Sequence, residues 1–309
     1  MAEAAPHTLP VLVFGANGQV GFELRRAAWA PGLAPLGLDR ASGDVTDAKA
    51  VSAAIAAHRP ALVVNASAYT AVDKAESERD TAFAVNRDGP ANLARACAAA
   101  GVPLIHISTD YVFDGTSKTT PWSESDPVAP QGVYAASKLA GEEAVRDAQP
   151  DHVILRTAWV FGAHGHNFVK TMLRLARERD ELRVVADQHG CPTPAAAIAA
   201  AIATIAQARL TGEGWTPGTF HYGGAPATTW HGFAERIVDR AAARIGRRPA
   251  VTAITTADFP TPARRPANSV LDTARLGQAY GIPPADWMAG LDRVLDDILD
   301  ETQGVGAKA

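Results

Sequence analysis

Residues 11 to 21, V-L-V-F-G-A-N-G-Q-V-G, join a β-branched apolar run to a turn rich in glycine. Gly15, Gly18 and Gly21 follow an expected first strand, Pro10 to Phe14, and open an expected helix near Gln19 to Trp29. Glycines at these places allow a tight turn and a close approach of the backbone to a pyrophosphate, which the helix N-terminus stabilises. Placed after a first strand, the G-x-x-G-x-x-G pattern predicts dinucleotide binding; the alternative is a purely structural turn.

The residues expected to contact the dinucleotide lie at the ends of the first three strands. Asp39 would accept from ribose hydroxyls, whereas Arg40 could accommodate a 2′-phosphate, so the sequence leaves NADH and NADPH open. Asp39 could instead cap a loop, and Asp44-Val45 could form an ordinary turn rather than reach the adenine. The candidate cofactor residues are Gly15, Asn17, Gly18, Gln19, Val20, Asp39, Arg40, Asp44, Val45, Ala66, Ala68 and Tyr69.

The alternation of short β-branched runs with longer alanine-rich runs, from Leu9 to about Phe161, is typical of repeated βαβ units. It predicts a doubly wound α/β fold with a parallel sheet of the Rossmann type, and a smaller C-terminal α/β substrate-binding domain. We expect the dinucleotide domain over residues 9–160 and about 180–208, the substrate domain over 161–179 and about 209–300, and a frayed tail over 301–309.

The periodicity also places the individual elements. Further strands are expected at Leu33 to Leu38, Leu62 to Asn65, Pro103 to Ser108, His152 to Thr157 and Leu182 to Val185, and loop plus strand at Thr211 to Gly224. Further helices are expected at Ala48 to His58, Arg79 to Ala99, Gln131 to Asp147, Phe168 to Glu178 and Pro194 to Gln207.

The composition limits the classes of partner that the chain is expected to bind. With 29 basic and 33 acidic residues among 309, there is no electrostatic reason to expect nucleic acid or an anionic membrane surface. No signal-peptide pattern opens the sequence, and no run approaches the ~20 apolar residues of a membrane span. Cys97 and Cys191 offer no paired spacing for a disulfide framework or a metal clip. We therefore expect a cytoplasmic protein.

A second polar group follows the expected fourth strand, which ends in S-T-D-Y at residues 108 to 111. Further on, Y-A-A-S-K places Tyr134 and Lys138 on one face of a helix. A lysine near the phenol, together with a cationic nicotinamide ring, could lower the pKa of Tyr134, which could then exchange a proton with a carbonyl oxygen. Because many helices carry Tyr-x-x-x-Lys by chance, the pair indicates a catalytic site only in combination with the nucleotide-binding turn.

These motifs resemble those of the extended short-chain dehydrogenase/reductases and, more closely, the dTDP-4-dehydrorhamnose reductases. The matching segments are N-A-S-A-Y-T-A-V-D-K-A-E, S-T-D-Y-V-F-D-G, Y-A-A-S-K-L-A-G-E, L-R-T-A-W-V-F-G, G-H-N-F, D-Q-H-G-C-P-T and R-R-P-A-N-S-V-L-D, between Val11 and about Leu299. The resemblance implies that NADPH or NADH reduces the 4-keto group of dTDP-4-dehydro-L-rhamnose to give dTDP-L-rhamnose, the last step of dTDP-rhamnose biosynthesis.

The resemblance also implies roles for single residues. Thr109 would polarise the substrate carbonyl, Tyr134 would protonate its oxygen, and Lys138 would tune Tyr134 and hold the nicotinamide ribose. Trp159 would pack against the deoxysugar unless it is a core residue, and Arg265 would face the diphosphate unless it faces solvent. The candidate substrate residues are Asp110, Tyr111, Trp159, Asn167, Phe168, Arg265 and Asn268.

Several alternatives stay open. Tyr111 stands where related 4,6-dehydratases carry a glutamate, which disfavours elimination of water. The substrate could be another nucleotide deoxysugar, or the chain could be a non-catalytic regulatory subunit of the same fold, as in methionine adenosyltransferase. Asn86 could be a buried bridging amide, and His164 and His166 lack a third zinc ligand. Some family members bind Mg²⁺ at a dimer contact, so Mg²⁺ and a homodimer fit the resemblance, but no residue is assigned to either.

Overall fold

The computed structural model describes residues 8–212 and 214–306. Its main sheet has six parallel strands in the order β10-β5-β4-β3-β1-β2. These strands are β1 (Leu9–Phe14), β2 (Leu33–Leu38), β3 (Leu62–Asn65), β4 (Leu104–Thr109), β5 (His152–Thr157) and β10 (Gly218–Tyr222). After β1 the chain forms β2 on one side of β1 and then crosses over to form β3 on its other side. The strand order therefore reverses at β1, and the carboxyl ends of β1 and β3 flank this topological switch point. The predicted doubly wound fold is confirmed.

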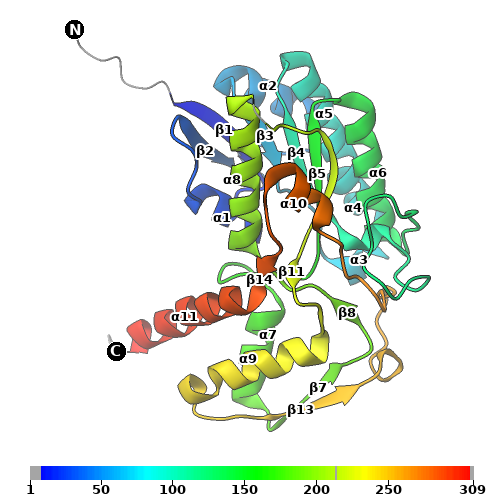
Figure 1. The fold of residues 1–309 in the computed structure, drawn as a ribbon, viewed down its shortest axis with the longest axis vertical. Helices are drawn as coiled ribbons and strands as arrows, with labels where there is room; N and C mark the ends of the chain where they lie inside the picture. The colour runs from blue at the N-terminus through cyan, green and yellow to red at the C-terminus, as the bar shows by residue number, and fades with distance from the viewer. Residues whose placement is uncertain (1–7, 213, 307–309) are drawn as a thin grey trace.

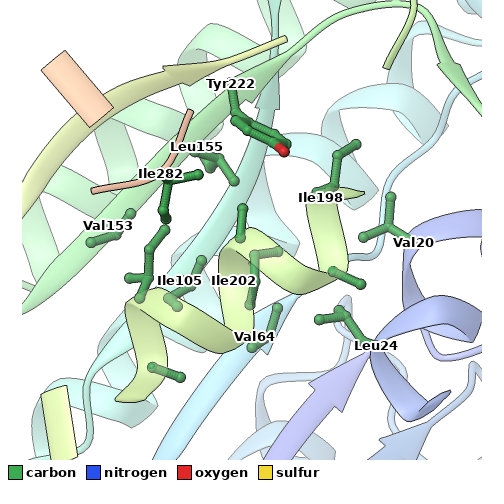
Figure 2. Close-up of a cluster of buried hydrophobic side chains, with 14 of the residues drawn as sticks. Val20, Leu24, Val64, Ile105, Val153, Leu155, Ile198, Ile202, Tyr222 and Ile282 are labelled. Carbon is green, nitrogen blue, oxygen red and sulfur yellow. The ribbon is translucent and has the colours of Figure 1, made fainter. Parts of the chain in front are cut away.

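Helices cover both faces of this sheet, because its strands are apolar on both faces. Val11 and Val13 of β1 lie in one cluster with α1 (Gln19–Arg26) and α8 (Ala195–Thr211), whereas Leu12 and Phe14 lie in another. That other cluster contains α2 (Ala48–His58), α5 (Gly89–Ala100) and α6 (Val133–Ala148). Figure 2 shows the first cluster, with Ile198 and Ile202 of α8 among side chains of the sheet and of α1.

The expected helix from Arg79 to Ala99 is divided in three. It consists of α4 (Arg79–Phe83), a π-helical turn η1 (Ala84–Asp88) and α5. Wide turns of this kind re-aim side chains and are frequent at functional sites. Here the turn contains Asn86, whose buried amide bonds to the backbone of Tyr69.

A smaller unit lies below the main sheet in Figure 1. It contains α7 (Phe168–Glu178), α9 (Trp230–Ile245), α11 (Trp287–Gly306) and a parallel pair, β7 (Glu181–Val185) and β13 (Ala250–Ile254). Its core is a separate cluster that includes Leu173, Phe233 and Leu291.

The sheet pairing differs from the expected domain division at two strands. β7 falls within the stretch expected to belong to the dinucleotide domain, but it pairs with β13; β10 falls within the expected substrate stretch, but it pairs with β5. Hydrophobic pattern identifies a strand but does not select its sheet, because that choice depends on contacts distant in sequence. The helix α11 also continues to Gly306, into the expected tail, since extending a formed helix needs no new nucleus. Residues 307–309 lie outside the described residues.

Short elements complete the chain. They are α3 (Val72–Ala75), η2 (Asp110–Val112), β6 (Val160–Phe161), β8 (His189–Gly190), β9 (Thr193–Pro194), β11 (Gly224–Ala225), β12 (Thr228–Thr229), η3 (Thr256–Asp258), α10 (Ala274–Tyr280) and β14 (Ala285–Asp286). Within residues 8–212 and 214–306, no helix has both the length and the apolar character that crossing a membrane requires.

Candidate active site

The glycine turn after β1 is shaped for an anion. Gly15 has φ +81°, and a Cβ there would lie 2.5 Å from the Ser67 nitrogen; one on Gly21 would lie 2.1 Å from the Gly15 oxygen. Gly18 differs, because its nearest protein atom would be 3.4 Å away, so packing within the protein does not require glycine there. No side chain caps the first turn of α1, and no acidic residue lies in it. The turn therefore fits a pyrophosphate held by free N–H groups.

Asp39 at the end of β2 is already bound within its own loop. Its carboxylate accepts from the backbone of Ala41 and Ser42 and from the Ser42 hydroxyl, at 3.1, 3.0 and 2.8 Å. These bonds, chiefly the one from the Ser42 hydroxyl, lower the pKa of Asp39. The loop-cap interpretation of Asp39 is thus correct, and its second oxygen accepts from Asn17 Nδ2 at 3.3 Å, beside the glycine turn. A carboxylate can accept more bonds, so the cap and a ribose contact are compatible.

The neighbouring candidates divide between surface and core. The Arg40 side chain is 89% exposed and lies 3.6 Å from the Asp44 carboxylate, which also accepts from the backbone and hydroxyl of Thr46. Val45, by contrast, lies in the hydrophobic core, and its carbonyl accepts from Asn92 Nδ2 at 3.0 Å. The predicted adenine contact of Val45 is therefore wrong for its side chain, because that side chain is needed to pack α2 and α5.

The loop after β3 is tied to the helix that carries Tyr134. Asn65 Oδ1 accepts from the backbone and hydroxyl of Ser67, and the Asn86 amide bonds to both the N–H and the carbonyl of Tyr69. Asn86 Nδ2 also donates to the Ser137 hydroxyl at 3.0 Å, and Asn86 is 1% exposed. Asn86 is therefore the buried bridging amide, and it fixes the Ala66 to Tyr69 loop against α6.

The end of β4 and the start of α6 bring the predicted catalytic residues together. Thr109 Oγ1 donates to Asp110 Oδ1 at 2.9 Å and accepts from the Tyr111 N–H at 3.2 Å. The Tyr111 and Tyr134 rings meet edge to face, with centroids 5.5 Å apart, and the Thr109 hydroxyl lies within hydrogen-bonding reach of Tyr134. Lys138, 2% exposed, donates from Nζ to the Ile107 carbonyl at 2.8 Å.

Burial moves the pKa values of Tyr134 and Lys138 in opposite directions. It raises the pKa of Tyr134 above its ordinary 10.0, with the Thr109 hydroxyl opposing, and it lowers the pKa of Lys138 to about 8, with Glu142 opposing. The expected lowering of the Tyr134 pKa by Lys138 is therefore wrong for the protein groups, because loss of hydration raises this pKa and the nearby Asp110 and Tyr111 raise it further. A phenol that stays protonated at neutral pH suits a proton donor.

Beneath Lys138 lies an ion pair that sequence reasoning missed. Glu142, one turn after Lys138, accepts from Arg156 Nε at 2.8 Å and Nη2 at 2.7 Å, and also from Arg146. Glu142 is 0% and Arg156 2% exposed. The signal was the glutamate that ends Y-A-A-S-K-L-A-G-E, four residues after Lys138, where side chains share a helix face.

The candidate substrate residues differ in their freedom to bind a ligand. The Trp159 ring stacks on Trp230 with centroids 3.6 Å apart, and its Nε1 donates to Ser269 Oγ at 3.1 Å. Its backbone has φ +47°, a strained value for a non-glycine residue, and such strain occurs at functional sites. Phe168 packs on the same Trp230. Arg265 donates to the Asp73 carboxylate at 2.6 Å and to the Tyr111 hydroxyl at 3.2 Å, so it faces the site rather than solvent.

Two predicted substrate contacts are amides that the fold itself uses. Asn167 caps α7 through the Lys170 N–H and donates to Gln19 Oε1 and the Gly162 carbonyl, at 2.9 and 2.7 Å. Asn268 donates to two carbonyls of the 118–120 segment, both at 2.9 Å, and accepts from the Val270 N–H. Both N–H groups of each amide donate to protein atoms and each Oδ1 accepts one N–H, so these side chains hold the segments around the site; their contact with the substrate stays a prediction.

The described residues contain no group of three or more His, Cys, Asp or Glu side chains that could hold a metal ion. His164 instead donates from Nε2 to the Asn17 carbonyl, 3.1 Å away, and its ring stacks on Phe22. His164 therefore stabilises the glycine turn from the outside.

The sequence model of the RmlD substrate binding domain matches residues 9–299. The chain belongs to this family. A dTDP-4-dehydrorhamnose reductase of Sinorhizobium fredii is 46% identical over 290 residues, which cover 94% of this chain and 97% of that protein.

Two solved structures agree with the RmlD assignment. The dTDP-4-dehydrorhamnose reductase of Clostridium acetobutylicum has a TM-score of 0.86 and 38% identity, covering 93% of this chain and 99% of that one. The enzyme of Bacillus anthracis, in complex with NADP, has a TM-score of 0.85 and 34% identity, covering 93% of this chain and 98% of that one. The RmlD family thus accounts for both the main sheet and the smaller unit.

Proposed function

We propose that this chain is an NADPH- or NADH-dependent dTDP-4-dehydrorhamnose reductase, which reduces the 4-keto group of dTDP-4-dehydro-L-rhamnose to give dTDP-L-rhamnose. One observation carries the proposal: Thr109, Tyr134 and Lys138 meet at the carboxyl end of β4, beside a glycine turn that fits a pyrophosphate. The full-length similarity to reductases of this name supports the substrate.

The bound nicotinamide would supply hydride, and the protein's own groups would handle the proton. Thr109 would turn its hydroxyl proton from Asp110 to the substrate carbonyl and so polarise it. Tyr134, whose raised pKa keeps the phenol protonated, would then give its proton to the oxygen as negative charge develops there. Lys138, fixed by the Ile107 carbonyl, would keep a positive charge near the phenolate that forms.

The remaining groups would bind and orient. Gly15, Gly18 and the first turn of α1 would hold the pyrophosphate, and Asp39 and Arg40 would face the adenine ribose. Tyr111 and Arg265 would border the sugar and its diphosphate, since they bond to each other at 3.2 Å beside Tyr134.

The test is oxidation of NADPH and of NADH with dTDP-4-dehydro-L-rhamnose generated in situ. Tyr134→Phe should lower kcat by ~10² to 10⁴ while dinucleotide binding is kept, because the phenol contributes the proton and not cofactor affinity. Turnover that survives this substitution would remove Tyr134 from the mechanism. Tight dinucleotide binding without turnover of the wild-type chain would reject this substrate and favour another keto-sugar or a regulatory subunit.

A further inference from the structure

The helix that carries Tyr134 begins without a cap of its own. Its N-cap residue, Gly132, has no side chain that could accept a hydrogen bond, and the first turn of α6 contains no acidic residue. The free N–H groups at the start of a helix need acceptors, which a side chain at the N-cap usually provides. Because Tyr134 is the second residue of α6, any group that fixes this turn also fixes the phenol.

Glu76 supplies the missing acceptor from a distant segment. Its Oε1 accepts from the Val133 N–H at 2.9 Å, across 57 residues of sequence. A carboxylate at this place also interacts favourably with the positive end of the helix dipole. Glu76 ends the V-D-K-A-E segment that follows β3, and the proposed reaction assigns no role to it.

The backbone at Gly132 leaves room for this carboxylate. Gly132 has φ +86°, and a Cβ there would lie 2.6 Å from Glu76 Oε1, far closer than van der Waals contact. A side chain at this position would therefore be strained and would also displace the carboxylate. Gly132 and Glu76 thus form one unit, in which the absence of a Cβ admits the acceptor.

The turn that presents Glu76 is itself held against the active site. Asp73, at the other end of α3, accepts from Arg265 at 2.6 Å. Ala75, which is 0% exposed, lies in one hydrophobic cluster with Tyr134. The helix α3 accordingly packs beside α6 (Figure 1). Glu76 is therefore fixed relative to Tyr134 by packing as well as by its hydrogen bond.

We infer that Glu76 is a positioning residue for the proposed reduction: by capping α6 from outside the helix, it sets the place of the Tyr134 phenol relative to the substrate carbonyl. The inference rests on the proposed function, because it assumes that Tyr134 gives its proton to a bound keto-sugar. Glu76 acts through the backbone of α6 and transfers no proton. Its loss should therefore slow the chemical step without weakening ligand binding.

The test compares kcat and KM of Glu76→Ala with those of wild type. The kcat is expressed per dinucleotide site, counted by titration with NADPH, so that a loss of folded protein does not lower it. Glu76→Ala should lower kcat by roughly 10- to 100-fold while both KM values stay within about 2-fold of wild type, since a displacement of ~1 Å can cost 10²-fold in rate. Glu76→Gln keeps an acceptor oxygen and should restore most of the kcat. Glu143→Ala, which removes an exposed carboxylate further along α6, is the matched control and should behave like wild type.

Gly132→Ala tests the same contact from its other side. The added Cβ should displace the carboxylate and lower kcat to a similar extent. The double variant Glu76→Ala/Gly132→Ala should be no slower than the slower single variant, because two residues that act as one unit do not have additive effects. Fully additive losses would show that the two residues act separately and would overturn the inference.

Amide hydrogen exchange separates this inference from the proposed function, because it needs no substrate. Exchange in the peptide that holds residues 132–136, followed by mass spectrometry, should be faster in Glu76→Ala than in wild type. Unchanged kcat per site in Glu76→Ala, or an equal loss in Glu76→Ala and Glu76→Gln, would overturn the inference. A wild-type chain that turns over no keto-sugar, but whose Glu76→Ala variant exchanges faster in this peptide, would reject the proposed substrate and keep Glu76 as the group that fixes the Tyr134 helix. Unchanged exchange would reject that role as well.

Discussion

Replacing Asp110 by asparagine should make the protein more stable at alkaline pH and leave its stability unchanged in acid. Asp110 is 3% exposed; its Oδ1 accepts from Thr109, and its Oδ2 has no hydrogen-bond partner among the described residues. The nearby Ser269 hydroxyl donates to the His189 carbonyl instead. Burial therefore raises the pKa of Asp110 from 3.8 to about 7, although the hydrogen bond from the Thr109 hydroxyl opposes it.

The direction in which stability changes with pH follows from the pKa values of this carboxyl in the folded and the unfolded protein. Because the folded value lies above the unfolded one, the folded protein retains the proton over the window from 3.8 to about 7, where the unfolded chain has lost it. The stability that this proton contributes is complete below pH 4 and is lost as pH rises through 7. At 1.36 kcal/mol per pKa unit, the loss is roughly 4 kcal/mol, an upper value because buried carboxylates gain some hydration.

The measurement is urea unfolding of wild type and Asp110→Asn, followed by circular dichroism at about pH 3.5 and at about pH 8, which lie on either side of the window. The variant should match wild type at the lower pH and be more stable by about 1–4 kcal/mol at the higher one. Asp114→Asn is the control, with the opposite sign, because hydrogen bonds from Ser117 and Thr116 lower the pKa of Asp114. An equal difference between Asp110→Asn and wild type at both pH values would refute the reasoning.

Three further variants test the site. Glu142→Gln should cost about 3–5 kcal/mol of unfolding free energy by urea titration, because Arg156 is left buried and unpaired; replacing both by methionine should recover most of it. The same single change should shift the alkaline limb of the kcat profile to lower pH, since Glu142 opposes the lowered pKa of Lys138. Gly18→Ala should raise the KM for NADPH with little change in Tm, because a Cβ there has room within the protein but would meet the pyrophosphate. Arg40→Ala should reduce the preference for NADPH over NADH, measured as the ratio of kcat/KM values; an unchanged ratio would exclude Arg40 from the 2′-phosphate site.

The sequence predicted the main sheet well because its signals are local. The ranges of β2, β3 and β5 agree with the predicted ones. In β3 and β5 a buried run with β-branched residues defines the strand, whereas β2 is a partly buried run without any β-branched residue. The glycine turn and the Tyr134 to Lys138 spacing are local too. Features that depend on one continuous segment can therefore be predicted from the sequence without knowledge of the tertiary contacts.

The errors concern contacts between distant segments. The amide of Asn268 bonds to carbonyls about 150 residues earlier in the chain, and Asn86 bonds to Ser137 across 51 residues. The partners of Asn268 leave no pattern in its neighbouring sequence, whereas the bridging role of Asn86 was among the interpretations that the sequence allowed and is confirmed. Burial likewise depends on segments distant in sequence. The pKa of Tyr134 is set by the packing around its ring, about which the Tyr-x-x-x-Lys pattern carries no information.

The burial of Tyr134 and Lys138 sets the protonation state in which each group enters the proposed reaction. If the lysine had lowered the phenol pKa to neutrality, a large part of the enzyme would carry a phenolate, which has no proton to give. Instead the phenol is a weak acid that stays protonated, and Lys138, with a pKa of about 8, is the stronger acid of the two. A phenolate formed by proton donation is therefore the stronger base of the two groups, so its reprotonation is favourable. The site is thus arranged for reduction of a carbonyl, and its activity should fall above pH ~8, where Lys138 loses its own proton.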